Sequence, residues 1–163
     1  MNRGRVAVIN IQKIAENLRV FKEFRESLNE EKASIENKAQ QDIMKLAEEG
    51  KDLELKSEIL SEKALKERTK KIQEKYMKIR EEAESKIANI QNKLNTALIN
   101  LNRAVEAASA ELIREKSGEY SMVIEKQVLL YYNAEDDITM EILKKLAKKK
   151  LNLAEKSTDE ENR

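Results

Sequence analysis

The 163-residue sequence contains no proline, no cysteine and no histidine, and only three glycines. Proline and glycine interrupt regular secondary structure, so their scarcity permits very long helices. Without cysteine and histidine, disulfides, Cys–His metal sites and the two commonest catalytic groups at neutral pH are excluded. The sequence also lacks the glycine-rich motifs that bind phosphates or dinucleotides. We therefore expect a protein that is not an enzyme and that holds no metal or cofactor.

Charged residues are as abundant as apolar ones, at 39% and 40% of the chain. An average soluble domain has about 25% charged and about 45–50% apolar residues, so narrow apolar stripes are expected rather than one thick core. The 32 basic and 31 acidic residues balance, which gives no overall attraction to nucleic acid. No apolar run reaches the roughly 18 residues of a membrane span, and no signal-peptide pattern precedes the first strand-like segment. If the protein is exported, we expect that its signal peptide has been removed.

Two long helices are predicted from apolar residues that recur every three or four positions. The first begins near Lys13 and ends in a bend or frayed segment at about residues 50–61. The second keeps a coiled-coil rhythm over residues 72–112 and stops near Gly118. Because these helices must return the chain to its first strand, they form an antiparallel hairpin, each arm roughly 45–60 Å long at 1.5 Å per residue.

A short β-branched apolar run at residues 6–9 and two apolar, partly β-branched runs at 122–124 and 128–132 predict three strands. Residues 125–127 are predicted to join the last two strands as a hairpin. Two or three short strands cannot form a stable sheet alone, so we expect partner chains to complete it.

The chain is predicted to close with an amphipathic helix that carries Ile142, Leu143 and Leu146 and is capped by Asp137 or Thr139. The predicted fold class is mainly α with a small β platform, as a long antiparallel coiled-coil hairpin on an oligomeric β-stranded body. The predicted parts are the body at 5–17 and 113–146, the hairpin at 18–112 with its tip near 50–61, and a flexible or frayed helical tail at 147–163.

This order of elements, together with several sequence segments, resembles the Skp (OmpH-type) family of periplasmic chaperones over about residues 5–146. The segments are Val6-Ala7-Val8-Ile9-Asn10-Ile11, Tyr120-Ser-Met-Val-Ile-Glu, Asp136-Asp137-Ile138-Thr139 and Ile142-Leu143-Lys144-Lys145-Leu146. The resemblance implies a jellyfish-like homotrimer in the periplasm, with three helical tentacles around a cavity. Such a protein would hold unfolded outer-membrane proteins and prevent their aggregation without ATP. The 17 residues after Leu146 extend beyond the resemblance.

The candidate client-binding residues lie at and after the predicted tip. Residues 63–80 hold eight basic and two acidic side chains, which would attract acidic clients or the phosphates of lipid or lipopolysaccharide. The alternatives are that the leucines and isoleucine close the hairpin on itself and that the basic side chains form a solvated face. The candidate residues are Leu53, Leu55, Ile59, Leu60, Lys63, Lys66, Arg68, Lys70, Lys71, Lys75 and Lys78.

Oligomerisation is assigned to the apolar residues of the predicted strands: Val6, Val8, Ile9, Met122, Val123, Ile124 and Leu130. The competing functions are a structural coiled-coil scaffold without clients, a prefoldin-like cytosolic chaperone and a nucleic-acid-binding protein. A scaffold leaves the flanking strands unexplained, and prefoldins place their strands between two helices rather than outside them. Balanced charge argues against specific nucleic-acid binding.

Overall fold

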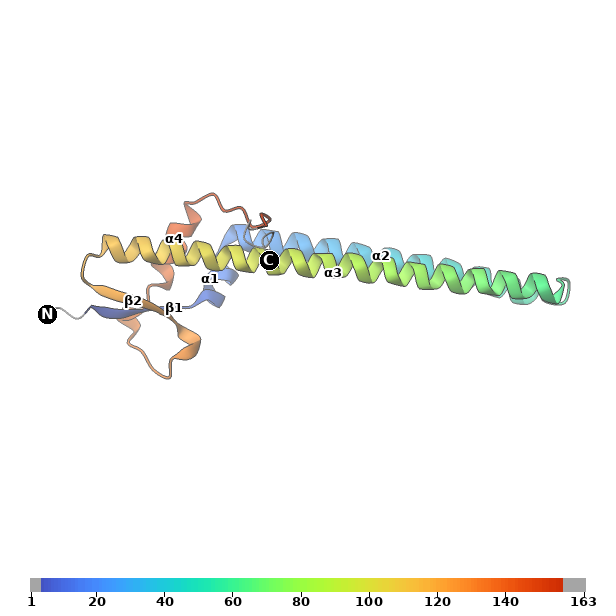
Figure 1. Ribbon diagram of the computed structural model, residues 1–163, viewed down its shortest axis with the longest axis horizontal. Helices are drawn as coiled ribbons and strands as arrows, with labels where there is room; N and C mark the ends of the chain where they lie inside the picture. The colour runs from blue at the N-terminus through green and yellow to red at the C-terminus, as the bar shows by residue number, and fades with distance from the viewer. Residues whose placement is uncertain (1–3, 157–163) are drawn as a thin grey trace, which may run out of the picture. The chain divides into compact units, whose positions relative to one another are not determined.

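The computed structural model describes residues 4–156 and shows a mainly helical chain with a long helical hairpin and a small parallel sheet (Figure 1). The chain divides into two compact units. The strand unit comprises Met1–Ser27 and Lys93–Arg163, and the hairpin unit comprises Leu28–Asn92. Helices α2 (Arg19–Leu55) and α3 (Glu62–Glu115) contribute residues to both units.

In the hairpin unit, α2 and α3 are antiparallel and connected by a short turn. Helix α2 continues through Gly50 to Leu55, and a Cβ at position 50 would meet no atom within 4 Å. The glycine therefore does not end the helix. Helix α3 starts after Ser61, whose Oγ accepts a hydrogen bond from the backbone N–H of Ala64 at 3.2 Å. Such a contact satisfies one of the free N–H groups at a helix start.

The seam between the two helices of the hairpin unit is narrow. Its buried residues are Leu28, Leu46, Leu53 and Ile90. Around Ala39 and Ala83 the small side chains leave a cavity of about 110 Å³ that residues of both helices line. Lys32 interrupts the apolar stripe of α2, because its side chain is exposed. Apolar burial, the main stabilising contribution here, is therefore spread thinly along this unit.

The sheet of the strand unit pairs β1 (Arg5–Ile9) with β2 (Tyr120–Glu125) in parallel, with Val8 opposite Ile124. Parallel strands need a long crossover connection, which the two helices provide. On the other side of β1, the N–H of Ile138 donates to the carbonyl of Val8 at 2.9 Å. Strand β1 is therefore flanked on both sides, whereas β2 has β1 as its only strand partner within residues 4–156.

Two glycines are required by the local geometry of the strand unit. A Cβ at Gly4 would lie 2.8 Å from the backbone nitrogen of Ser121. The backbones at the start of β1 and β2 therefore lie too close together for a side chain at position 4. Gly118 has φ of +82° and lies in the turn between α3 and β2. This left-handed conformation favours glycine and explains the predicted helix stop.

The core of the strand unit is formed by both strands, α3, the start of α2 and two short helices, α1 (Ile11–Asn17) and α4 (Thr139–Ala147). One continuous helix from about Lys13 was predicted, but Leu18 is extended and separates α1 from α2. The last helix is confirmed, but its N-cap residue is Ile138 rather than the predicted Asp137 or Thr139. The carboxylate of Asp137 accepts a hydrogen bond from the N–H of Thr139, the first helical residue, at 2.9 Å. The largest fully buried core residues include Phe21, Ile14, Leu101, Ile142 and Leu146.

The predicted strand at Val128–Tyr132, and with it the strand hairpin, is wrong. Strand β2 runs on to Glu125, a short 3₁₀ helix covers Lys126–Val128, and the segment to Tyr132 is irregular. The Glu125 carboxylate accepts a hydrogen bond from the N–H of Gln127 at 2.8 Å and closes this turn. Strand propensity depends on context, and within the described residues this segment pairs with neither strand of the sheet.

The segment after α4 differs from the predicted frayed tail over its described part, residues 148–156. It has no helix, and Leu153 is 4% exposed within the core of the strand unit. Residues 157–163 of the predicted tail lie outside the described residues.

Candidate functional site

The apolar residues at the end of the hairpin unit separate into buried and exposed ones. Leu53 is buried, and Leu60 is half-buried in the turn. Leu55 and Ile59 are 80% and 84% exposed. The turn therefore closes on Leu53 but presents two large apolar side chains to solvent. Single exposed apolar residues are common, so the exposure allows contact with a client without requiring it.

The candidate basic residues are all exposed and partly neutralised by neighbours. The Lys75 ammonium contacts Glu49 of the opposite helix at 2.9 Å, whereas Lys70 and Lys78 form looser pairs within α3, at 3.9 Å to Glu74 and Glu82. Exposed pairs of this kind contribute about 0–1 kcal/mol each. The side chains are therefore free to exchange these partners for others.

Three of the candidate cations meet in a groove of about 230 Å³ between α2 and α3. The groove carries four cations and two carboxylates around an apolar floor. Its lining residues are Glu49, Asp52, Leu53, Lys56, Arg68, Lys71, Ile72 and Lys75. Lys63, Lys66, Lys70 and Lys78 do not line it. Sequence analysis missed Lys56, because the residue precedes the basic stretch and joins it only through the turn.

The candidate oligomerisation residues also fall into two groups. Val8 and Ile9 are buried within the chain, and Val123 and Ile124 are half-buried. The exposed members are Val6 at 37%, Met122 at 50% and Leu130 at 107%. Tyr131 and Val128, neighbours of Leu130, are 81% and 74% exposed. The strand unit thus exposes apolar side chains on β2 and on the irregular segment that follows it.

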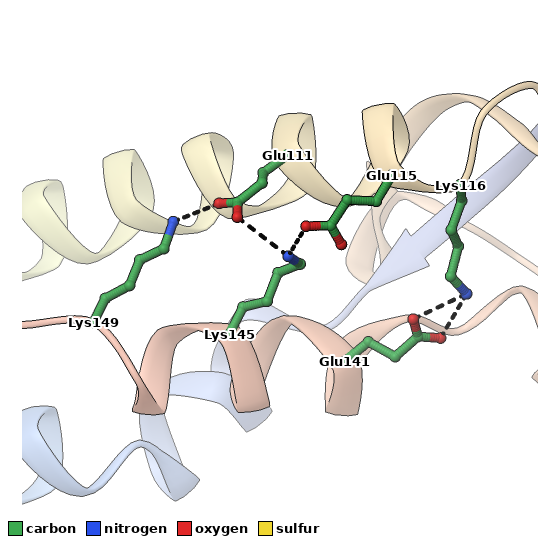
Figure 2. A network of polar contacts seen from close by, with 6 residues as sticks. All are labelled: Glu111, Glu115, Lys116, Glu141, Lys145 and Lys149. Carbon is green, nitrogen blue, oxygen red and sulfur yellow. Dashed lines mark hydrogen bonds and ion pairs between the residues drawn. The ribbon is translucent and has the colours of Figure 1, made fainter.

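An ion-pair network fixes α4 against α3 in the strand unit (Figure 2). The Lys145 ammonium lies 2.7 Å from Glu115 and 3.4 Å from Glu111, and Lys149 lies 2.7 Å from Glu111. Hydrogen bonds from Lys149 and Lys145 lower the pKa of Glu111, and those to Glu115 and Glu111 raise the pKa of Lys145.

A further pair extends the network toward β2, between Lys116 and Glu141 at 2.9 Å. The hydrogen bond with Glu141 raises the pKa of Lys116. The Lys116 ammonium and the guanidinium of Arg5 also lie over the ring of buried Tyr120, at 5.7 and 5.8 Å from its centroid. Sequence analysis missed this network, because Glu111 and Lys145 are 34 residues apart and only the packing of the two helices brings them together.

Comparison with known proteins identifies the family to which this chain belongs. Within residues 4–156, none of the helices is both long and apolar enough to cross a membrane. The model of the family described as outer membrane protein (OmpH-like) matches residues 5–146. None of the curated proteins matches the sequence significantly.

A solved structure shares the fold. A crystal structure of a proposed outer membrane chaperone (OmpH-like) from Caulobacter crescentus CB15 superposes with a TM-score of 0.80 at 14% identity. The match covers 96% of this chain and 93% of the other. Because the family model spans most of the sequence, from the first strand to the end of α4, the chain belongs to the OmpH-like family of outer membrane proteins.

Proposed function

We propose that this protein is an ATP-independent holdase that binds unfolded outer-membrane proteins in the periplasm and prevents their aggregation. The observation that carries the proposal is the match to the OmpH-like family over residues 5–146. The chaperone description of the Caulobacter protein with the same fold supports it.

We propose further that three copies assemble through their strand units. The support is the edge of β2, which has no strand partner on its outer side within the described residues, and the exposed side chains of Val6, Met122 and Leu130. An unpaired strand edge with apolar neighbours is a template for another chain. The proposed trimer would hold clients in a cavity between its helical hairpins.

Client binding is assigned to the end of the hairpin unit, where Leu55 and Ile59 supply apolar contacts and Arg68, Lys71 and Lys75 supply positive charge. Each contact is weak, but several hairpins acting on one chain multiply their affinities. The same cations would suit the phosphates of lipid or lipopolysaccharide.

The test is the aggregation of a urea-unfolded outer-membrane β-barrel protein, followed by light scattering on dilution. We expect suppression at about one proposed trimer per client, without nucleotide. An inert coiled coil of similar length serves as the control. Equal aggregation with both would reject the holdase and favour a structural scaffold, the competing function for the same helices.

Charge is tested separately by reversing Arg68 and Lys71, both of which line the groove, to glutamate. Capture should weaken, and more so at low salt, because the Debye length is about 30 Å at 0.01 M and about 8 Å at physiological ionic strength. A salt-independent loss would instead indicate damage to the hairpin.

A further inference from the structure

The groove at the end of the hairpin unit is lined by two matching sets of residues. Each set recurs at i, i+3, i+4 and i+7, a spacing that places side chains on one face of a helix. The set from α2 and the turn after it is Glu49, Asp52, Leu53 and Lys56, and the set from α3 is Arg68, Lys71, Ile72 and Lys75. The N–H of Lys56 still donates to the carbonyl of Asp52 at 3.2 Å, so Lys56 keeps a helical position.

The floor of the groove is apolar and only partly covered. Leu53 is 9% exposed and Ile72 is half-buried. The free space is about 230 Å³, which is larger than the engineered apolar cavity of about 150 Å³ that binds benzene. One aromatic or large aliphatic side chain can therefore lie on this floor.

Most of the charges around the floor have no partner within the chain. One of the four cations, Lys75, is paired across the groove at 2.9 Å. The side chains of Lys56, Arg68 and Lys71 form no ion pair or hydrogen bond within residues 4–156, and neither does that of Asp52. The groove therefore offers three unpaired cations and one unpaired carboxylate beside an apolar floor.

This combination is complementary to the C-terminal end of a polypeptide. A terminal carboxylate suits the cations, because a guanidinium such as that of Arg68 can bind a carboxylate through two parallel hydrogen bonds. The N–H groups of the last residues can donate to the carboxylate of Asp52. An apolar last side chain can cover Leu53 and Ile72.

Two other ligands fit the groove less well. An internal stretch of polypeptide has no carboxylate on its backbone, so the three cations would remain unpaired. A phosphate has no N–H group to donate and would face Asp52 as a like charge, which weakens binding.

We propose that this groove captures the C-terminal end of an unfolded polypeptide, with the terminal carboxylate on Arg68 and Lys71 and an apolar last side chain on Leu53. The inference rests on the proposed function, since it names the part of a client that the end of the hairpin unit recognises. Every polypeptide has one such end. The groove would therefore hold one defined point of the client, whereas the exposed Leu55 and Ile59 contact any apolar stretch.

The test uses the full-length protein and two short peptides without charged side chains, both ending in phenylalanine and carrying an uncharged fluorophore at the N-terminus. One peptide has a free carboxylate and the other a carboxamide. At low ionic strength, fluorescence anisotropy should show about tenfold tighter binding of the free acid, because the carboxamide loses the charge-assisted hydrogen bonds. A free-acid peptide with serine as its last residue should also bind more weakly than the phenylalanine peptide. Equal binding of the free acid and the carboxamide would overturn the proposal.

Matched variants assign the effect to the groove. Arg68→Gln combined with Lys71→Gln should abolish the difference between the free acid and the carboxamide. Lys66→Gln combined with Lys70→Gln removes the same charge from α3 outside the groove and should preserve the difference. All four side chains are exposed, so both variants should keep wild-type helical content by circular dichroism. Loss of the difference in both variants would indicate a general attraction to positive charge and would overturn the proposal.

Vesicles of phosphatidylglycerol test the competing ligand. If Arg68→Gln combined with Lys71→Gln weakens vesicle binding while the wild type binds the two peptides alike, the groove takes lipid phosphates instead of a chain end. Failure of this inference can also be told apart from failure of the holdase, because the peptide assay contains no outer-membrane protein. A wild type that suppresses aggregation but does not distinguish the peptides would reject the inference alone.

Discussion

The ammonium of Lys145 on α4 lies 2.7 Å from the carboxylate of Glu115 on α3, with only 18% of the Lys145 side chain exposed. A charge this sheltered is less screened by solvent than the exposed pairs along the hairpin. Because Lys145 also contacts Glu111, which Lys149 contacts as well, three pairs share two carboxylates and hold α4 on α3 (Figure 2).

Acidification should destabilise the strand unit through Glu111. Its pKa is lowered in the folded state, so its stabilising contribution is present above the unfolded pKa of about 4.3 and is lost as the pH falls through the folded value. Glu111→Gln should lower the urea midpoint at pH 7 and reduce its fall toward pH 3. The exposed Glu106→Gln on the same helix is the control. An equal pH dependence in all three proteins would contradict the assignment.

Shortening a side chain of the hairpin seam should lower stability where that side chain is buried. Ile90 is 7% exposed, so Ile90→Ala should lower the free energy of unfolding by about 2–3 kcal/mol. Met77, also on α3 but 53% exposed, should change it by about 0.5 kcal/mol or less when replaced by alanine. Urea denaturation followed by circular dichroism measures both, and similar losses would mean that the seam lies on another face.

Two glycine-to-alanine substitutions should change the free energy of unfolding in opposite directions. Gly50→Ala should raise the free energy of unfolding by about 0.5–1 kcal/mol, because position 50 is inside α2 and has free space for a Cβ. Gly118→Ala should lower it by about 1–2 kcal/mol, because φ is +82° there. Thermal unfolding of the two variants provides the comparison. A higher stability of Gly118→Ala than of the wild type would contradict the observed turn.

The proposed assembly is tested best by residues that the single chain leaves exposed. Leu130→Asp and Met122→Asp should dissociate the proposed trimer in sedimentation while helical content is retained, because neither side chain is buried within the chain. Val8→Asp is uninformative here. Val8 is 2% exposed, and an unpaired charge at that position would unfold the strand unit itself. A monomeric wild type would reject the assembly.

Client contact at the turn is tested by a pair of variants. The double change Leu55→Ser and Ile59→Ser should weaken client protection with little change in stability, since both side chains are at least 80% exposed. Leu53→Ser should instead lower stability, because that leucine is buried under the turn. Unchanged client protection in the double variant would remove these residues from the proposed binding surface.

The periodicity of apolar residues was sufficient to predict the helical hairpin. Steps of three and four residues place Leu101, Val105, Ala108 and Leu112 on one face of α3, and all four are buried. The first strand was predicted correctly from its short run of apolar, mostly β-branched residues. These features depend on neighbours in the chain, and local spacing therefore specifies them.

The pairing of segments far apart in the chain could not be predicted in the same way. Residues 128–132 have strand-like composition, yet they pair with no strand of the described chain, although the outer edge of β2 is unpaired there. At the hairpin end, composition could not separate buried Leu53 from exposed Leu55, because the path of the turn decides which side chain faces the opposite helix.

Local pattern thus specified which residues form helices and which faces of them are apolar, because regular helices repeat every 3.6 residues whatever they contact. The contacts between Asn100 and Leu153, and between Glu111 and Lys145, came only from the folded chain. Hydrogen bonds and ion pairs depend on distances of a few ångströms between side chains. Those distances are set by how α3, α4 and the last segment pack on one shared core, which spacing along the sequence does not encode.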